Sequence, residues 1–240
     1  MSLSIIIPIY NEVDQLKFTI KKLLIFGDFL RKYEVIFIDD FSKDNSYKFV
    51  KNNSKKNTFI KIFKNKKKGL GSAISLGISK AKYEYTCIFM CDLSDDVKDL
   101  IKYYKIIKKE KADAVFGTRF SKKSKIKNYP FLKLILNRLS NNFIKLLFLS
   151  DYNDFTNAFK IYKRKTLIKL LPIVSESFNV FLELPLKIIS RKYRYVITSI
   201  NWNGRAHGIS KFNIKEVGSM YIFTLLYCLL EKYLLNLKKK

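Results

Sequence analysis

Short apolar runs rich in β-branched residues alternate with longer segments of helical periodicity over the first half of the chain. Five such runs are predicted strands, at residues 3–9, 33–38, 58–63, 85–90 and 112–116. Helical patterns separate them, at residues 13–26, 44–53, 72–82 and 97–110. Because these strands are apolar on both faces, the pattern predicts an α/β fold with a mostly parallel sheet and helices on both faces.

The pattern changes after residue 120. Helices are predicted at residues 131–149 and 178–189, a strand at 195–200, and a final helical segment at 217–237 before a lysine tail. No internal repeat and no long linker interrupts the chain. We therefore expect one α/β domain over residues 1–213, followed by a hydrophobic and basic C-terminal helix over residues 214–240.

The composition narrows the class of protein. The chain has 240 residues, of which 48% are hydrophobic, so it folds around a core and is no disordered basic tail. Its net charge of +27 indicates anionic partners, although lysines spread over solvated faces also account for it. No nucleic-acid-binding motif accompanies the charge, so nucleic acid is not an expected partner. The single histidine excludes multi-histidine metal sites, and three cysteines without a disulfide framework favour a reducing compartment.

Polar residues follow the ends of three predicted strands. They are Tyr10 and Glu12, Asp39 and Asp40, and Asp92 and Ser94. Taken singly, each of them is equally well explained as part of a helix N-terminus. Taken together they predict a site, because ligands of parallel sheets bind beyond the carboxyl ends of the strands. A carboxylate at Asp39 or Asp40 suits the N–H of a nucleobase or a ribose hydroxyl.

Two further segments bear on ligand binding. Residues 66–73, KKKGLGSA, form a basic loop at a helix start, which suits a phosphate or is a structural turn. In residues 90–96, MCDLSDD, the spacing of Asp92 and Ser94 suits the oxygen ligands of Mg²⁺ or Mn²⁺. Asp96 is expected to cap the next helix, and Cys91 to be buried as a small hydrophobic residue.

Seven segments occur in a characteristic order between residues 4 and 213: IIIPIYNE, IDDFS, KKKGLGSA, MCDLSDD, GTRF, DFTNAFKIY and GRAHGISKF. This series resembles glycosyltransferase family 2, and within it the polyprenyl-phosphate sugar transferases of the dolichol-phosphate mannosyltransferase type. The resemblance implies a GT-A fold, which is Rossmann-like, together with a nucleotide-sugar donor, a divalent metal ion and inversion at the anomeric carbon. Residues 1–213 would then be the catalytic domain.

The resemblance also assigns residues. Its nucleotide-sugar-binding positions correspond to Pro8, Tyr10, Glu12, Asp39, Asp40, Cys91 and Asp92. Its catalytic positions correspond to Asp92, Arg119, Arg205 and Lys211. Its acceptor-phosphate positions correspond to Arg119, Lys133 or the nearby Arg138, Arg205 and Lys211. Lys133 is equally well explained as a solvated surface lysine.

The metal motif of the family is altered in this chain. Asp92 and Ser94 occupy two of its positions, but Met90 replaces the first aspartate. A thioether binds hard cations poorly, so a weakened site for Mg²⁺ or Mn²⁺ is expected. Asp154 and Glu183 match further family positions, at which we expect side chains that orient their neighbours.

The implied reaction moves a hexose from a donor of the GDP-mannose or UDP-glucose type to a polyprenyl phosphate. This acceptor is already an anion, so catalysis depends on positioning and on neutralising the leaving diphosphate. A hydroxyl of a growing surface glycan would instead need a general base, for which Asp95 and Asp154 are candidates. A third alternative, left open by Met90, is a relative that binds nucleotide sugars without catalysis.

The C-terminal segment predicts contact with a membrane. Residues 217–230 are 14 uncharged positions, about 21 Å of helix, which is shorter than a ~30 Å hydrocarbon core. We therefore expect an amphipathic interfacial helix, not a span, on the anionic cytoplasmic face of the cell membrane. Residues 131–149 are either a second interfacial helix or a helix packed on the domain. A homo-oligomer or a membrane partner protein is compatible with this arrangement.

Overall fold

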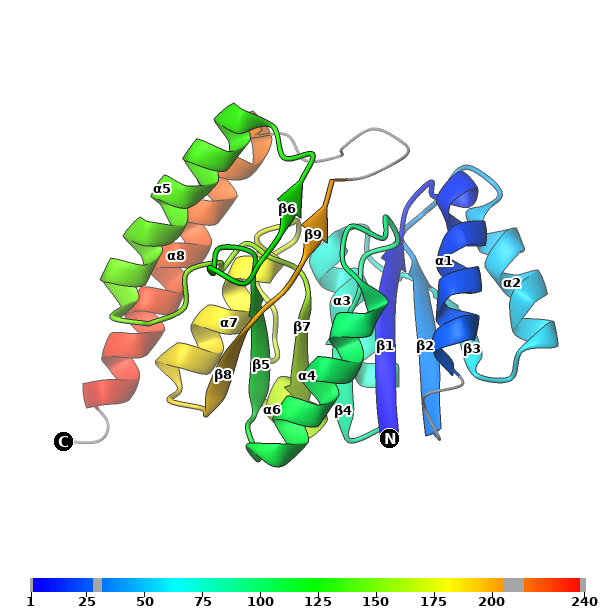
Figure 1. Ribbon diagram of the computed structural model, residues 1–240, viewed down its shortest axis with the longest axis horizontal. Coiled ribbons are helices and arrows are strands. Elements are labelled where there is room, and N and C mark those ends of the chain that lie inside the picture. The colour runs from blue at the N-terminus through cyan, green and yellow to red at the C-terminus, as the bar shows by residue number, and fades with distance from the viewer. Residues whose placement is uncertain (1, 28–31, 205–213, 238–240) are drawn as a thin grey trace.

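Seven strands form one sheet in the order β3-β2-β1-β4-β7-β5-β8 in the computed structural model, which describes residues 2–27, 32–204 and 214–237 (Figure 1). The strands are β1 Ser2–Ile9, β2 Lys32–Asp39, β3 Ile60–Lys64, β4 Tyr85–Ile88, β5 Ala114–Thr118, β7 Lys160–Lys163 and β8 Tyr195–Ser199. All of them run parallel except β7, which is antiparallel to β4 and β5. The predicted α/β fold with a mostly parallel sheet is confirmed.

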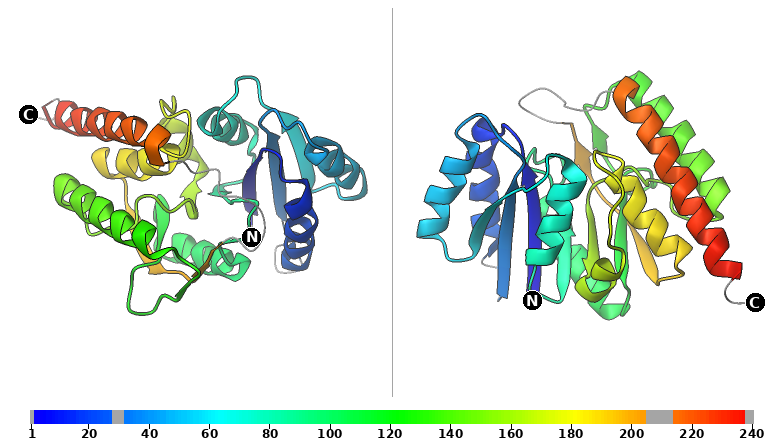
Figure 2. Two further views of the ribbon diagram at one scale, coloured as in Figure 1. Left: turned by 90° about the horizontal axis from the view of Figure 1, so that it is seen from above. Right: turned by 180° about the vertical axis from the view of Figure 1, so that it is seen from behind.

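Helices cover both faces of this sheet. One face carries α1 Val13–Gly27, α2 Ser46–Lys56 and α4 Val97–Lys109. The other face carries α3 Leu70–Lys80, α6 Arg164–Lys169 and α7 Val180–Ser190. Beyond α7, α5 Phe131–Phe148 and α8 Ile214–Leu237 lie on the same flank of the molecule and form an outer layer (Figures 1 and 2).

The central strands divide their side chains between two cores. Ile5 and Ile7 of β1 pack with α1 and α4, whereas Ile6 between them packs with α3 on the opposite face. Val35 and Ile36 of β2 alternate in the same way. Successive side chains of a strand point to opposite faces, so a strand buried on both sides is apolar at every position. This is the physical reason that the sequence pattern identified these strands.

Three strands left no clear signal in the pattern. β7 has the sequence KIYK, in which lysines bracket two apolar residues. The two-residue strands β6 Ile126–Lys127 and β9 Trp202–Asn203 pair with each other in parallel, and Trp202 also forms an isolated antiparallel bridge with Asp95. Such short strands depend on partners distant in the chain, and a pattern read along the sequence does not contain those partners.

The C-terminal helix α8 is packed against the domain along one side. On this side of α8 the Cys228 side chain is buried in the core, and Glu231 forms a 2.5 Å ion pair with Arg191 at the end of α7. Lys232 Nζ donates to the carbonyl oxygen of Phe148 at the end of α5, at 2.7 Å. Within the described residues, no helix has the length and apolar character needed to cross a membrane.

Candidate functional site

The candidate site lies where β1, β2 and β4 end. Asp39 is the last residue of β2, and the Asp40 N–H donates to the carbonyl oxygen of Ile9 at the end of β1, at 2.8 Å. β1 pairs with both β2 and β4, so the polar residues after these strands share one edge of the sheet. The structure therefore brings together the neighbourhoods of Tyr10, Asp39 and Asp92.

The adjacent aspartates Asp39 and Asp40 have different surroundings. The Asp40 carboxylate accepts hydrogen bonds from Gly69 N, at 2.9 Å, and from Asn65 Nδ2, at 2.7 Å, and so holds the basic loop. Asp39 is only 5% exposed, and its Oδ1 accepts no hydrogen bond from the described residues. A buried carboxylate oxygen without a donor is costly unless a ligand supplies one. Of the two residues, Asp39 is thus the acceptor that remains for a ligand.

The glycines of the basic loop allow another segment to pack directly on α3. A Cβ atom at Gly71 would lie 1.7 Å from the carbonyl oxygen of Ser175, and Gly69 has a φ of 135°. The Gly71 N–H donates to the carbonyl oxygen of Glu176 at 3.2 Å. The first turn of α3 is therefore covered by residues 173–177. This geometry supports the structural interpretation of residues 66–73 over a phosphate cradle.

One cation of this loop lies beside the candidate site. Lys68 Nζ lies 5.6 Å from the centroid of the Tyr10 ring, a cation–π distance. Lys67 points instead to Glu176 and pairs with it at 2.6 Å, with both side chains exposed. Lys68 is therefore the cation of the loop that lies beside Tyr10.

Helix α1 holds the segment after β4. Thr19 Oγ1 donates to the carbonyl oxygen of Cys91 at 2.7 Å, and Gln15 Nε2 to that of Asp92 at 3.5 Å. The Ser94 N–H donates to Asp92 Oδ1 at 3.1 Å, which closes a tight turn across Leu93, whose φ is +56°. Cys91 is buried, as predicted for a small hydrophobic residue.

The predicted helix cap after this turn is present. Asp96 is the N-cap of α4, and its carboxylate accepts from Lys98 N at 2.9 Å. This side chain therefore has a structural role.

The same segment offers limited ligands to a divalent cation. Within the described residues, no group of three His, Cys, Asp or Glu side chains is placed to hold a metal. Of the three positions of the metal motif, Met90 offers only a thioether and Ser94 is a buried hydroxyl. Asp92 is therefore the one carboxylate among them. Because Mg²⁺ sites often combine one or two carboxylates with substrate phosphates, these residues fit a cation only together with the phosphates of a bound donor.

Asp95 is a buried acid next to this turn. Only 5% of it is exposed, and its Oδ1 accepts no hydrogen bond from the described residues. Burial, reinforced by the nearby charge of Asp92, raises the pKa of the Asp95 carboxyl to about 8. Asp95 therefore favours its protonated form at neutral pH, and its buried position leaves its carboxyl little access to a substrate hydroxyl.

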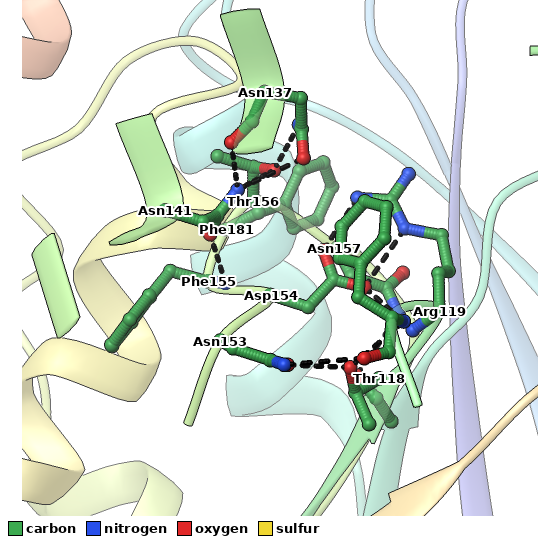
Figure 3. A network of polar contacts seen from close by, with 12 residues as sticks. Thr118, Arg119, Asn137, Asn141, Asn153, Asp154, Phe155, Thr156, Asn157 and Phe181 are labelled. Carbon is green, nitrogen blue, oxygen red and sulfur yellow. Dashed lines mark hydrogen bonds and ion pairs between the residues drawn. The ribbon is translucent and has the colours of Figure 1, made fainter. Parts of the chain in front are cut away.

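Arg119 forms a buried ion pair with Asp154 directly after β5 (Figure 3). The Asp154 carboxylate accepts from Arg119 N, Nε and Nη2, at 2.8, 2.9 and 2.6 Å. Burial lowers the pKa of Arg119, but the charge and hydrogen bonds of Asp154 outweigh it and raise that pKa above its ordinary value. Arg119 is thus ionised, and the Asp154 carboxylate accepts three hydrogen bonds from it.

Aromatic rings surround the guanidinium of Arg119. The ring centroids of Phe120, Tyr129 and Trp202 lie 5.3, 5.6 and 5.7 Å from its Cζ. Arg138, the alternative to Lys133 at the acceptor-phosphate position, also contacts Phe120, with its Cζ 4.3 Å from the ring centroid. Rings of this kind exclude water and strengthen the charge interactions among them.

The remaining predicted residues are distributed unevenly. Lys133 is exposed on the first turn of α5. Arg205 and Lys211, together with the only histidine, His207, lie outside the described residues. The buried Glu183 accepts from Val174 N and Ser175 N, at 3.0 and 2.7 Å, and so positions the segment that covers α3.

Sequence reasoning missed two buried lysines. Lys187 pairs with Glu183 at 2.5 Å and donates to the carbonyl oxygen of Pro172 at 2.6 Å. Lys160, on β7, donates to the carbonyl oxygens of Phe155 and Asn157. Burial lowers the pKa of the Lys160 ammonium to about 7. In a chain with lysines at so many exposed positions, nothing in the sequence marks these two as buried.

Carboxylate acceptors beyond the carboxyl ends of parallel strands are typical of α/β proteins that bind nucleotides. One such class is the protein family described as "Glycosyl transferase family 2", whose sequence model matches residues 4–171. The chain belongs to this family, and its resemblance to the polyprenyl-phosphate branch is confirmed by the relatives.

Two curated relatives share this sequence pattern. The dolichol-phosphate mannosyltransferase of Pyrococcus furiosus is 27% identical over 224 residues, which are 90% of this chain and 61% of the relative. The polyprenol monophosphomannose synthase of Mycolicibacterium smegmatis is 26% identical over 110 residues, 44% of this chain and 42% of the relative. The chain thus spans less than two thirds of either protein.

Solved structures agree on the fold. Glucosyl-3-phosphoglycerate synthase of Mycobacterium tuberculosis, in complex with Mn²⁺, UDP-glucose and phosphoglyceric acid, superimposes with a TM-score of 0.70 at 16% identity. The alignment covers 95% of this chain and 79% of that one. The predicted GT-A fold is therefore confirmed.

Proposed function

We propose that this chain is the catalytic part of an inverting glycosyltransferase that moves a hexose from a nucleoside-diphosphate sugar to a polyprenyl phosphate. Family membership and the names of the two curated relatives support this reaction. The observation that carries it is the geometry of the acids near Arg119: the Asp154 carboxylate accepts three hydrogen bonds from the arginine, and the Asp95 carboxyl is buried. Neither is suited to deprotonate a sugar hydroxyl, whereas a lipid phosphate needs no base.

The donor would bind at the ends of β1, β2 and β4. Asp39 would accept from the nucleobase or ribose, with Tyr10 and Lys68 beside it. Asp92 would hold a divalent cation, which supplies charge to neutralise the leaving diphosphate. Arg119, Arg205 and Lys211 would add positive charge for the diphosphate and the acceptor phosphate. Arg138 or Lys133 would complete the acceptor site.

A membrane surface would present the acceptor. Apolar side chains of α8 are exposed at Met220, Ile222, Phe223, Leu226, Leu230, Leu234 and Leu237. An exposed apolar row of this kind, in a protein with a net charge of +27, fits the anionic cytoplasmic leaflet. Residues 1–213 would then form the catalytic domain, and residues 214–240 the segment that joins it to the membrane.

The test is transfer of radiolabelled sugar from GDP-mannose and from UDP-glucose to undecaprenyl phosphate, with and without Mn²⁺ or Mg²⁺. We expect lipid-linked product from one donor. Asp39→Ala should raise the KM for that donor about 10- to 100-fold, because a hydrogen bond to a charged acceptor is lost. Asp92→Ala should abolish stimulation by the cation.

Asp151→Ala is the matched control, since Asp151 is exposed and outside the site. It should leave both KM and kcat unchanged. Binding of a nucleotide sugar without lipid-linked product would favour a glycan acceptor or a non-catalytic relative, which Met90 leaves open. Absence of nucleotide binding would contradict the proposal altogether.

A further inference from the structure

Helix α5 has an outer face of exposed apolar side chains and an inner face that bears polar ones. The exposed residues are Phe131, Leu132, Ile135, Leu136, Leu139, Phe143 and Leu146. On the inner face, Asn141 is fully buried, although an aliphatic residue would fill a core position at lower cost. Burying a side-chain amide costs folding free energy unless the amide makes its hydrogen bonds within the protein.

The amide of Asn141 is bonded to the segment 153–157 (Figure 3). The Phe155 N–H donates to Asn141 Oδ1 at 2.6 Å. Asn141 Nδ2 donates to Asn137 Oδ1 at 3.0 Å, and Asn137 Nδ2 donates to Thr156 Oγ1 at 2.9 Å. Arg138, from the same helix, donates to the carbonyl oxygen of residue 153 at 3.2 Å. Three side chains of α5 therefore hold one short segment.

The other side of this segment holds the end of β5. Thr118 Oγ1 donates to Asn153 Oδ1 at 2.6 Å, and Arg119 is bound by Asp154 through three hydrogen bonds. Buried Lys160 donates to the carbonyl oxygen of Phe155 from below, at 3.1 Å. The segment thus joins the inner face of α5 to the arginine through directional hydrogen bonds.

The surroundings of α5 point to an anionic lipid surface as the occupant of its outer face. The chain that leads into the helix carries exposed lysines at Lys122, Lys123, Lys125 and Lys127, and Lys133 follows on the first turn. Lysines beside an exposed apolar helix face complement anionic headgroups, and together they provide the two signals that stable surface binding needs.

We propose that Asn141 is a positioning residue that couples contact between α5 and an anionic lipid surface to the Arg119–Asp154 ion pair. Contact on the outer face orders α5, and the Asn141–Phe155 bond carries that order to the segment that holds the arginine. The importance of this coupling for sugar transfer depends on the proposed function. The coupling itself is measured without donor or acceptor, so its failure and the failure of the proposed function are separate results.

The experiment is hydrogen exchange of the full chain with and without vesicles of phosphatidylglycerol and phosphatidylcholine in equal parts. In the wild type, vesicles should slow exchange in α5 and also at the amides of Phe155 and Arg119, roughly 2- to 30-fold. In Asn141→Ala, vesicles should still protect α5, but the added protection at Phe155 and Arg119 should be lost. A merely structural role of Asn141 would change exchange without vesicles and leave their effect intact.

Two further variants control the result. Ser140→Ala changes an exposed polar side chain one position before Asn141 on α5, and should behave as the wild type. Thr156→Val keeps the shape of the segment and removes one acceptor, so it should weaken the coupling even if Asn141→Ala does not fold. Vesicle-dependent protection of Arg119 in both altered variants, or no protection of α5 in the wild type, would overturn the proposal.

Discussion

Two ionisable side chains, Asp95 and Lys160, are buried beside the Arg119–Asp154 pair. Burial raises the pKa of Asp95 to about 8 and lowers that of Lys160 to about 7, because water no longer stabilises either charge. Both shifts disfavour the ionised form, so each residue reduces the stability of the fold at the pH where it would be charged in the unfolded chain.

A first prediction at this scale concerns the pH dependence of stability. Between pH 5 and pH 7 the folded state keeps a proton on Asp95 that the unfolded chain releases, since the folded pKa is about 8 and the ordinary value 3.8. Stability therefore falls as the pH rises through this window, by roughly 2–3 kcal/mol. Asp95→Asn removes the titrating group, and its free energy of unfolding should be correspondingly flatter.

The measurement is urea unfolding of the wild type and Asp95→Asn at pH 5, 6 and 7. The opposing contribution of Lys160 lies mainly above pH 7, because its pKa falls from 10.5 to about 7 on folding. Asp151→Asn, at an exposed position, should keep the slope of the wild type. Equal slopes for the wild type and Asp95→Asn would show that Asp95 is ionised in the fold.

At the scale of elements, the first turn of α3 and the segment 173–177 depend on each other. The segment approaches so closely that position 71 has no space for a side chain, and Glu183 of α7 holds it from the other side. Packing between a loop and a helix backbone is specific because neither side can yield without losing hydrogen bonds.

Gly71→Ala tests this contact. The new methyl group would overlap the Ser175 carbonyl oxygen, so the segment must move, and we expect a loss of about 1–3 kcal/mol in the free energy of unfolding. Gly218→Ala on α8 is the matched control, since no atom lies within 4 Å of its added Cβ. That control should be neutral or stabilising by up to about 1 kcal/mol, because alanine favours a helix. Equal effects of both substitutions in urea unfolding would contradict the close contact.

At the scale of the whole molecule, α5 and α8 expose apolar side chains on the same flank, away from α1 and α2 (Figure 2). A net charge of +27 attracts the molecule to any anionic surface, but a bare charge orients it only weakly. The apolar flank provides the orientation, because only this side gains free energy by leaving water.

Vesicle flotation distinguishes these two contributions. Leu139→Glu combined with Phe223→Glu places charges on α5 and α8, and should reduce binding to anionic vesicles by at least about tenfold. Phe18→Glu combined with Leu24→Glu is the control, since both side chains are partly exposed on α1 and the pair adds the same two charges elsewhere. It should bind nearly as the wild type, and binding of all forms should weaken with salt. Equal losses in both variants would mean that charge alone drives binding.

The pattern of apolar residues alone predicted the central strands, their mostly parallel arrangement and the edge of the sheet that carries the polar residues. This succeeded because β1 and β2 are buried on both faces, so that residues 5–9 and 35–38 are apolar without interruption. The ordered motifs likewise identified the family, which the match over residues 4–171 confirms. These features are local or periodic, and a single chain displays them directly.

Only the tertiary structure decided how neighbouring residues divide their roles. Asp39 and Asp40 are adjacent and chemically identical, yet only Asp40 meets Gly69, so only Asp39 retains an acceptor for a ligand. Asn141 likewise acquires its role from Phe155, on a segment that returns to α5 after the helix has ended. Hydrogen bonds and burial depend on groups that the fold brings from distant positions, and that information is absent from any local stretch of sequence.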